Sequence, residues 1–378
     1  MKPNNPFLIS GYHSPEFFCD REQETAKILD ALSNGRNVTL IAPRRMGKTG
    51  LIRHAFYHLK EQQPEIVTLY MDIFSTQSLG DFVRLFANTV LGKLDSAPQK
   101  ALSRISQFIR SCRPVFTFDE ITGVPKVTID VAPAEEENTL KEIFDYLASS
   151  EKRCYIAIDE FQQIVRYEDE TIEAIIRTYV QRCTNAHFIF SGSQRHLMNE
   201  MFTSPARPFY QSVAIINLQP LALDVYTDFC VSKFEQAGKY IERDVVRILY
   251  ERFDAVTSYM HRILNVLFSK TNKGEICNAI MVDEAIDLII RLSFDTYESL
   301  FYQMPEKQRM LFLAIAREGR VKEITGGTFV RKHKLISSSS VNSALKGLLE
   351  KDFVTMDKNM YCVYDHFFVL WLKFKGII

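Results

Sequence analysis

The segment 38–49 constrains the fold of this chain more than any other part of the sequence. A run rich in β-branched residues leads into a short basic loop that ends in Gly47, Lys48 and Thr49. An amphipathic stretch over 51–60 follows at once. A strand, a glycine-containing loop and a helix in this order are typical of a phosphate-binding loop. The pattern therefore predicts a parallel α/β sheet, with this loop at the carboxyl end of one strand.

The loop suits a nucleoside triphosphate, because backbone N–H groups and the amino end of the following helix attract phosphate oxygens. Lys48 would place a positive charge at the β- and γ-phosphates, and the Thr49 hydroxyl would hold Mg²⁺. Position 42 is Ala where this pattern usually opens with Gly, so an ordinary basic turn before a helix is the alternative. Arg44 and Arg45 either face the phosphates or extend into solvent, and we slightly favour solvent. The candidate nucleotide-binding residues of the loop are Ala42, Pro43, Arg44, Arg45, Met46, Gly47, Lys48, Thr49 and Gly50.

A second apolar run ends in two acids and supplies the partner that a metal-bound triphosphate needs. Residues 154–158 are apolar throughout, as in a central strand that is buried on both faces. Asp159 follows at the carboxyl end, where ligands of open α/β sheets bind, and would support Mg²⁺ directly or through water. Glu160 is placed to act as the general base that activates the attacking water. The alternative is an exposed acidic pair at the start of the next helix.

A third apolar run, 187–190, ends in small polar residues. Ser191 or Ser193 could hydrogen-bond the γ-phosphate or the attacking water from a neighbouring strand. A turn that caps a helix from about Gln194 is the alternative, and both can hold together.

Charge and composition exclude some classes of function. The 46 Lys and Arg residues equal the 46 Asp and Glu residues, whereas a protein that coats nucleic acid is usually more cationic. This charge balance argues against a broad DNA-coating surface and is compatible with a local basic patch. The sequence has no apolar run near the roughly 20 residues that cross a bilayer, and its scattered cysteines fit buried thiols in a reducing cytosol. We therefore expect a cytoplasmic protein without a membrane partner.

The first predicted domain, 1–220, holds the α/β core. An entry helix over 22–33 would be capped by Asp20. A helix is predicted over 82–94 from its apolar stripe. Two strand patterns on either side of a glycine-containing turn predict a β-hairpin insertion near 113–131.

Two further domains are predicted after the core. Helical patterns fill 221–300. The last part, 301–378, contains a helix at 306–317, a serine-capped helix over 337–351 and a strand pair around 356–360. A helix, a serine-capped helix and a hairpin wing predict a winged helix.

Together these residues resemble an AAA+-type ATPase, and most closely the archaeal and bacterial single-chain ATPases of the STAND class. The resemblance spans nearly the whole chain and rests on the segments 18–22, 42–49, 158–162, 190–193, 208–210 and 364–371. It implies an α/β fold with a P-loop parallel sheet of strand order 5-1-4-3-2, a helical lid and a C-terminal winged helix. It also implies ATP and Mg²⁺ as the ligands.

The resemblance implies roles for single residues as well. Arg21 would lie near the adenine and ribose, and Ser191 or Ser193 would take the sensor position. Arg207 lies where ring-forming relatives carry an arginine finger, so it acts either in that role or in an ordinary surface ion pair. The lid segment 256–260 lacks the Gly-x-Pro that STAND relatives often carry. The candidate catalytic residues are Lys48, Glu160, Ser191, Ser193 and Arg207, and the candidate metal ligands are Thr49 and Asp159.

The favoured function is an ATP-hydrolysing switch that couples Mg-ATP turnover to the lid and the winged helix. The alternative is an ATP-regulated protein that binds or remodels DNA through the winged-helix lysines Lys332, Lys334, Lys346 and Lys351. Apolar spacing along 341–349 explains that helix as core-facing without DNA, so we expect a protein partner at the winged helix or the hairpin insertion. A nucleotide-binding protein without turnover is the third interpretation, and Glu160 argues against it because a dead site needs no general base. The chain would act as a monomer or as a nucleotide-dependent oligomer.

Overall fold

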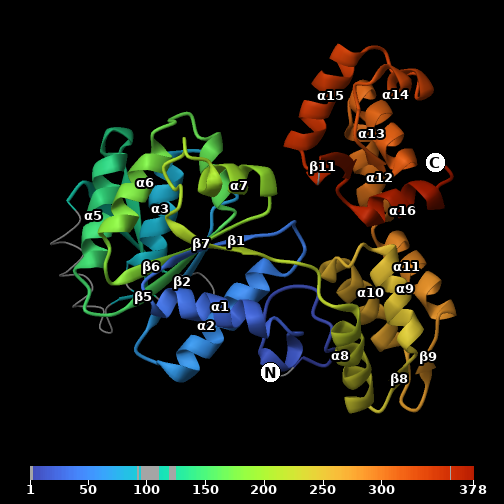
Figure 1. The fold of residues 1–378 in the computed structure, drawn as a ribbon, viewed down its shortest axis with the longest axis horizontal. Coiled ribbons are helices and arrows are strands. Elements are labelled where there is room, and N and C mark those ends of the chain that lie inside the picture. The colour runs from blue at the N-terminus through green and yellow to red at the C-terminus, as the bar shows by residue number, and fades with distance from the viewer. Residues whose placement is uncertain (1–2, 92, 95–109, 119–124, 358) are drawn as a thin grey trace. The chain divides into compact units, whose positions relative to one another are not determined.

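The computed structural model describes residues 3–91, 93–94, 110–118, 125–357 and 359–378. These residues form two compact units (Figure 1): one spans Leu8–Tyr226, and the other combines Met1–Phe7 with Thr227–Ile378. The first unit corresponds to the predicted core 1–220, and the second holds the predicted lid and winged helix together. Within the described ranges, no helix is both long and apolar enough to cross a membrane.

A five-stranded parallel sheet forms the centre of the first unit. Its strands are β1 (Asn37–Ile41), β2 (Val67–Asp72), β5 (Cys154–Asp159), β6 (Ala186–Gly192) and β7 (Val213–Asn217). They lie in the order β2-β5-β6-β1-β7. When these five strands are numbered 1 to 5 along the chain and the order is read from the β7 edge, it is 5-1-4-3-2, as predicted. Every residue of β5 is buried, as its apolar sequence predicts. The carboxyl ends of β1, β5 and β6 therefore meet at one end of the sheet.

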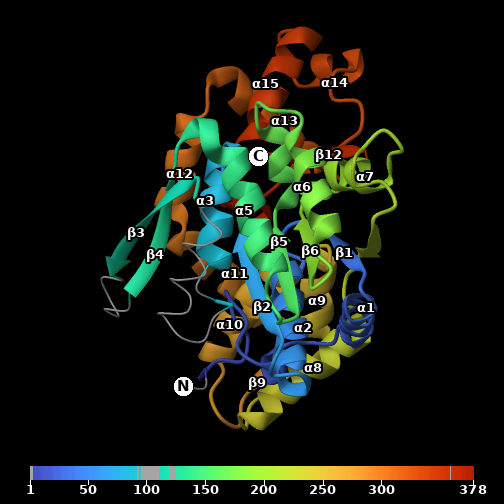
Figure 2. The ribbon, with the colours of Figure 1, turned by 90° about the vertical axis from the view of Figure 1, so that its left-hand side faces the viewer.

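Helices cover both faces of this sheet. The helices are α1 (Glu22–Ser33), α2 (Lys48–Gln62), α3 (Leu79–Val90), α5 (Glu136–Ala148), α6 (Ile172–Arg182) and α7 (Arg195–Thr203), with the 3-10 turns η1 (Pro15–Phe17), η2 (Pro133–Glu135) and η3 (Phe161–Arg166). Figures 1 and 2 show α1 and α2 on one face and α3, α5 and α6 on the other. The second face carries a large apolar cluster that includes Phe86, Phe144, Phe188 and Phe190.

Two local predictions differ from the structure. The entry helix begins as predicted, but Asp20 does not cap it, because Arg21 occupies the N-cap position in the left-handed region with φ 74°. The helix expected over 82–94 runs over Leu79–Val90 instead. The Ser78 side chain caps its first turn and so starts it earlier.

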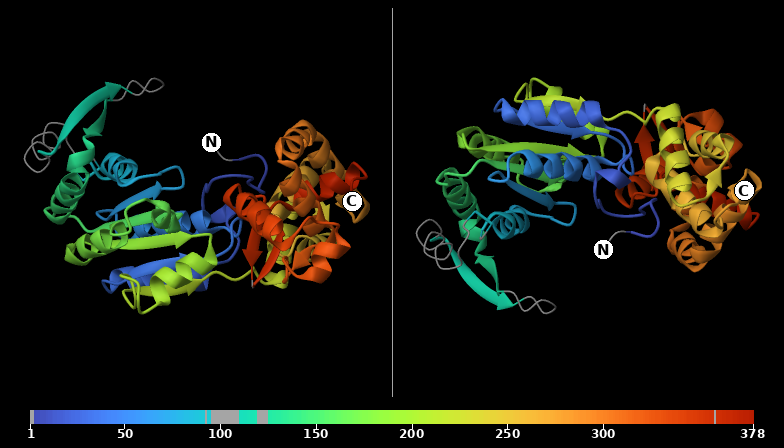
Figure 3. Two further views of the ribbon diagram at one scale, coloured as in Figure 1. Left: turned by 90° about the horizontal axis from the view of Figure 1, so that it is seen from above. Right: turned by 90° about the horizontal axis from the view of Figure 1, so that it is seen from below.

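The predicted insertion is a two-stranded antiparallel hairpin. β3 (Cys112–Phe118) pairs with β4 (Pro125–Val131), and the predicted turn at 120–124 lies outside the described residues. Figures 2 and 3 show the hairpin projecting beyond the central sheet. Its second strand returns beside α3 and buries Ile129 and Val131 in the apolar cluster, so the base of the insertion belongs to the core.

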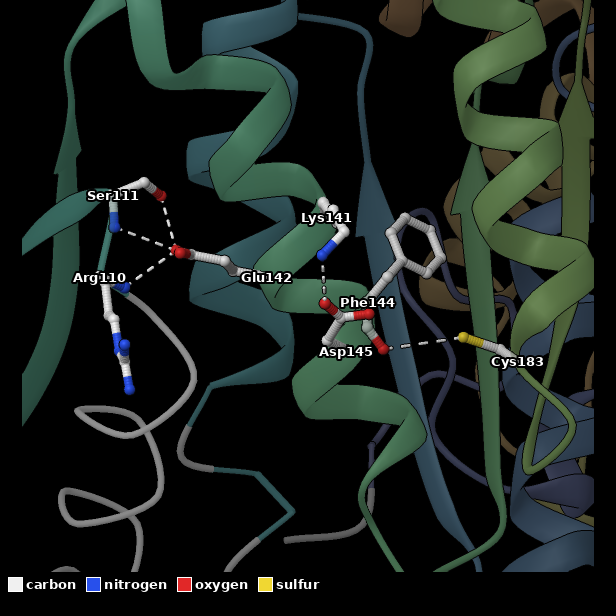
Figure 4. A network of polar contacts seen from close by, with 7 residues as sticks. All are labelled: Arg110, Ser111, Lys141, Glu142, Phe144, Asp145 and Cys183. Carbon is white, nitrogen blue, oxygen red and sulfur yellow. Dashed lines mark hydrogen bonds and ion pairs between the residues drawn. The ribbon is translucent and has the colours of Figure 1, made fainter.

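A single carboxylate anchors the start of the hairpin to α5 (Figure 4). Glu142 Oε2 accepts hydrogen bonds from the backbone N–H of Arg110 at 2.9 Å and of Ser111 at 3.0 Å, and from the Ser111 hydroxyl at 2.6 Å. Two residues further along α5, the Phe144 carbonyl accepts a hydrogen bond from Cys183 Sγ at 3.9 Å. Hydrogen bonds to a charged acceptor are stronger than neutral ones, so Glu142 fixes where the insertion leaves the core.

The second unit is mostly helical. Its first part contains most of α8 (Leu223–Gln236), with α9 (Arg243–Arg252), α10 (Thr257–Lys270), α11 (Ile280–Leu292), α12 (Phe294–Gln303) and the short pair β8 (Tyr240–Ile241) and β9 (Ile276–Cys277). Its second part contains α13 (Glu306–Glu318), α14 (Gly327–Lys332), α15 (Ser338–Glu350), α16 (His366–Phe374), β10 (Arg320–Val321), β11 (Val354–Asp357) and β12 (Met360–Val363). The three short strands form a sheet of order β10-β12-β11. Ser337 caps α15 through the backbone N–H of Ser340, as its serine run predicts.

The first residues of the chain pack in this second unit. The ring of Phe7 contacts the rings of Phe229, Phe234 and Phe268. Asn265 Nδ2 donates to the Phe7 carbonyl at 2.8 Å. Residues 3–7 are therefore part of the second unit, although the core follows them directly in sequence.

The lid and the winged helix pack as one compact unit. The indole of Trp371 in α16 is fully buried and contacts Phe301 of α12. The Tyr259 hydroxyl of α10 donates to the Tyr364 carbonyl at 2.9 Å, and its ring stacks on His366. These contacts connect α10 and α12 to the last helix of the chain.

Candidate functional site

The loop between β1 and α2 holds its lysine in a buried position. Gly47 is the N-cap of α2 at φ 87°, a conformation that residues with a Cβ rarely adopt. Lys48 is 6% exposed, and its Nζ donates to the carbonyl oxygens of Ala42 at 3.2 Å and Pro43 at 3.3 Å. Burial lowers the pKa of Lys48, and the nearby Glu160 opposes this by favouring the charged form. The ammonium is thus held by backbone oxygens that phosphate oxygens can replace.

Gly50 keeps the start of α2 open to the segment before α1. A Cβ at this position would lie 2.9 Å from Cε2 of Phe18. The Phe18 ring stacks on His54 of α2, with the ring centroids 4.6 Å apart. The structure therefore gives Gly50 a packing role, because it admits this ring against the helix.

Asp159 lies next to the loop, as the sequence predicts. It is 3% exposed at the carboxyl end of β5. The hydroxyls of Thr49 and Tyr70 each donate to its Oδ2 at 2.7 Å, and the Ser191 hydroxyl donates to its Oδ1. Buried charges require such partners. Groups from α2, β2 and β6 therefore converge on this carboxylate, and the two predicted metal ligands are in direct contact.

Glu160 lies just beyond the strand with a left-handed backbone, φ 56°. Its Oε2 accepts hydrogen bonds from Ser193 Oγ and from Gln162 Nε2, both at 2.6 Å. Arg44 Nε donates to the same Ser193 Oγ at 3.2 Å. The carboxylate thus bonds across to the end of β6, and the candidate base, one candidate serine and one loop arginine form a single cluster.

The two candidate serines take different positions at the end of β6. Ser191 donates to the acid that ends β5, and Ser193 donates to the acid that follows it. Between them, a Cβ on Gly192 would lie 2.2 Å from Gln162 Oε1, so only glycine fits there. The N-cap residue of α7 is Gln194, whose side chain makes no capping bond among the described residues. Both serines therefore lie at the site, and their contact with the γ-phosphate or the attacking water stays a prediction.

Sequence reasoning missed two residues of β2 that lie at the site. Strand alternation places Tyr70 and Asp72 on the same face. Tyr70 reaches Asp159, and the guanidinium of Arg53 lies over its ring, 4.2 Å from the centroid. Asp72 is in register with Asp159, and burial raises the pKa of its carboxyl. The alternation of side chains along β2 could have placed Tyr70 and Asp72 on one face. It indicates that they lie near Asp159 only once β5 is known to be the neighbouring strand.

Two further candidate arginines, Arg21 and Arg207, are held by carboxylates. Arg21 is 5% exposed and pairs with Glu24 at 2.9 Å through Nη1, while its Nη2 is buried without a hydrogen-bond partner in the described part of the chain. Arg207 Nη2 pairs with Glu173 at 2.7 Å, and burial raises the pKa of that carboxyl to about 6. The contact of Arg21 with adenine and ribose and the finger role of Arg207 stay predictions.

The residues present fit ATP and Mg²⁺ as ligands. Mg²⁺ prefers oxygen, and proteins usually hold it with one or two side chains, phosphates and water. Thr49 and Asp159 offer such oxygens, and the described residues contain no cluster of three or more His, Cys, Asp or Glu that would enclose a metal. The unpaired Nη2 of Arg21 is a buried donor that a bound nucleotide could satisfy.

This fold and this site define a P-loop ATPase. The sequence matches a family described as an ATPase domain predominantly from Archaea over residues 18–260, and a probable winged helix domain over residues 295–374. The chain therefore belongs to this archaeal-type ATPase family and carries a C-terminal winged helix. No curated protein matches the sequence.

Several solved structures share the fold over almost the whole chain. The Walker-type ATPase Paby2304 of Pyrococcus abyssi is 16% identical, with a TM-score of 0.62 over 97% of this chain and 99% of that chain. The ORC2 protein of Aeropyrum pernix, in ADPNP–ADP complexes, is 13% identical, with a TM-score of 0.59 over 100% of this chain and 99% of that chain. The Aeropyrum pernix ORC1 protein in complex with DNA is 12% identical, with a TM-score of 0.57 over 99% of this chain and 97% of that chain. At these identities the likeness establishes a shared fold.

Proposed function

We propose that this protein binds and hydrolyses Mg-ATP and acts as a STAND-type switch, in which the core drives the lid and the winged helix. The observation that carries the proposal is the 2.7 Å contact between Thr49 Oγ1 and Asp159 Oδ2, which joins the phosphate loop to the acid-ended strand. Membership of an ATPase family supports ATP as the nucleotide. Mg²⁺, when bound, would neutralise charge on the phosphates and orient them.

Each site residue has a task in hydrolysis. Lys48 exchanges its carbonyl partners for β- and γ-phosphate oxygens. Thr49 and Asp159 would hold Mg²⁺. Glu160 accepts the proton of the water that attacks the γ-phosphorus, while the electron pair of the broken bond stays on ADP. Ser193 orients Glu160 through their 2.6 Å hydrogen bond.

The contacts inside the second unit support its role as the responding part of the switch. Asp254, between α9 and α10, pairs with Arg320 of β10 at 2.9 Å. Tyr259 of α10 donates to the Tyr364 carbonyl and accepts from the backbone N–H of His366. Because these bonds connect the lid to the winged helix, a lid that responds to nucleotide would carry the winged helix with it.

Thermal unfolding and turnover assays test this function. At about 100 times its Kd, Mg-ATP should stabilise the wild-type protein by roughly 2.7 kcal/mol. Lys48→Ala should lose this stabilisation. Glu160→Gln should keep it but hydrolyse ATP about 10²–10⁴ times more slowly. Equal stabilisation of wild type and Lys48→Ala would contradict nucleotide binding at the loop, and unchanged turnover in Glu160→Gln would remove the general base.

An ATP-regulated protein that binds or remodels DNA is the second candidate, and one structurally similar protein was solved in complex with DNA. The side chains of Lys334, Lys346 and Lys351 are exposed on the winged helix, as DNA contact requires. Lys332 is exposed as well, but it pairs with Glu318 at 2.5 Å, and Lys346 Nζ lies 3.9 Å from Glu350. The apolar side of α15 is buried within its own domain. We favour a protein partner, contacted through the winged helix or the β3–β4 hairpin by a monomer or a nucleotide-dependent oligomer.

Fluorescence anisotropy with a labelled duplex separates the two candidates. Phosphate contacts release counterions, so DNA binding should weaken steeply as salt rises. Replacing Lys334, Lys346 and Lys351 together with Ala should then reduce the salt dependence. If the wild-type protein does not bind the duplex at low salt, with or without Mg-ATP, the DNA version is wrong.

A further inference from the structure

Arg44 lies beside the candidate base, although the sequence alone slightly favoured solvent for this side chain. Its Nε donates to Ser193 Oγ at 3.2 Å, and Ser193 donates in turn to Glu160 Oε2 at 2.6 Å. The ring of Phe74 lies against the guanidinium, with Cζ 4.8 Å from the ring centroid. The side chain of Arg44 is partly buried. The hydrogen bond to Ser193 and the contact with the Phe74 ring hold its guanidinium at the site.

We propose that Arg44 is a catalytic residue that neutralises, within its own chain, the charge that develops on the γ-phosphoryl group during hydrolysis. This inference rests on the proposed ATPase function. In that step the water oxygen bonds to the γ-phosphorus, the bond to the bridging oxygen breaks with its electron pair left on ADP, and Glu160 takes the water proton. The negative charge is spread over the phosphoryl and leaving oxygens, where a fixed guanidinium stabilises it.

Arg207, which lies where ring-forming relatives carry an arginine finger, already forms ion pairs within the first unit. Its Nη2 pairs with the buried carboxylate of Glu173 at 2.7 Å, and its Nη1 lies 3.9 Å from Glu200. If Arg207 reached into the nucleotide site of another chain, the buried carboxylate of Glu173 would lose its partner, which costs stability. Arg44 needs no second chain, so turnover per chain should not depend on protein concentration.

Two substitutions at Arg44 separate this role from nucleotide binding. An arginine finger contributes about 10³–10⁵ to kcat, so if Arg44 has this role, Arg44→Ala should lose at least about 1,000-fold. Its affinity for ADP should stay near the wild-type value, while its affinity for ADP with aluminium fluoride, a mimic of the transferring phosphoryl group, should fall about 100-fold or more. Arg44→Lys keeps the charge but not the planar donor fork, so it should restore little of either. Arg36→Ala is the matched control, because it removes an exposed arginine that pairs with Asp30 outside the site.

Mixing two variants tests whether Arg44 acts within its own chain. Glu160→Gln retains Arg44 but lacks the base, so adding it to Arg44→Ala should restore no turnover. Restored turnover, or a kcat that rises with protein concentration, would overturn the inference. If both Arg44→Ala and Arg44→Lys hydrolyse ATP within about tenfold of wild type, the catalytic role is wrong while the ATPase proposal stands. A wild-type chain that neither binds nor hydrolyses Mg-ATP would overturn both.

Discussion

Replacing Tyr70 with Phe should weaken the hold of the site on Mg²⁺ without removing the nucleotide. The substitution deletes the hydroxyl that donates to Asp159 Oδ2 at 2.7 Å and keeps the ring under Arg53. A hydrogen bond to a charged group contributes about 1.5–3 kcal/mol, and loss of a partner of a metal ligand typically costs about 10–100-fold in metal affinity. Asp159 keeps the donors Thr49 and Ser191. We therefore expect the lower end of the range, about a tenfold rise in the Mg²⁺ concentration at half-maximal effect.

The assay is a Mg²⁺ titration of the binding of a fluorescent ATP analogue, which does not depend on turnover. Burial of Tyr70 raises the pKa of its phenol, so the hydroxyl remains a donor and the effect should be the same from about pH 6 to pH 9. Tyr167→Phe is the matched control, because it removes a buried hydroxyl that bonds Thr76 at 2.5 Å in the same unit. An unchanged Mg²⁺ requirement in Tyr70→Phe would refute the reasoning, and an equal rise in both variants would point to a general loosening of the core.

Three further variants test other contacts. Gly50→Ala should lower the thermal unfolding temperature, because its Cβ would lie 2.9 Å from Phe18 and overpacking costs about 1–3 kcal/mol; an unchanged midpoint would contradict that contact. Burial raises the pKa of Glu173 from 4.5 to about 6, so its contribution to stability is complete below the unfolded pKa and is lost as pH rises through the folded value. As the pH rises from below 4.5 to neutrality, the free energy of unfolding should fall by about 2 kcal/mol more for wild type than for Glu173→Gln. Denaturant titrations at several pH values measure this difference, and an equal change in the two proteins would disprove it. Glu142→Ala should speed hydrogen exchange of the β3–β4 amides while the central sheet stays protected, and exchange equal to wild type would show that other contacts hold the hairpin.

The core and its main chemistry could be predicted because two kinds of signal coincide in the same segments. β1 and β5 are apolar runs, and each is followed by residues with a specific chemical use: Lys48 and Thr49 after the first, Asp159 and Glu160 at the end of the second. The carboxyl ends of parallel strands meet at one end of a sheet, so their proximity follows from the sequence pattern. The contact between Thr49 and Asp159 confirms that argument.

The contacts that escaped prediction join side chains from segments far apart in the sequence. Tyr70 carries no local sign of a role, because its partner strand is known only from the fold. A basic loop residue such as Arg44 has no partner nearby, and Ser193 lies 149 positions away. Asp20 is a favourable N-cap residue by type, but Asp20 and Arg21 both have positive φ, and Arg21 takes the N-cap position although the helix begins at the predicted residue.

The chain crosses between its two units twice, once after Phe7 and once after Tyr226. Proteolytic cleavage at one crossing would leave the halves tethered through the other. A core fragment that begins at the first residue would also separate Phe7 from the rings of Phe229, Phe234 and Phe268, and would carry an apolar side chain that has lost its packing.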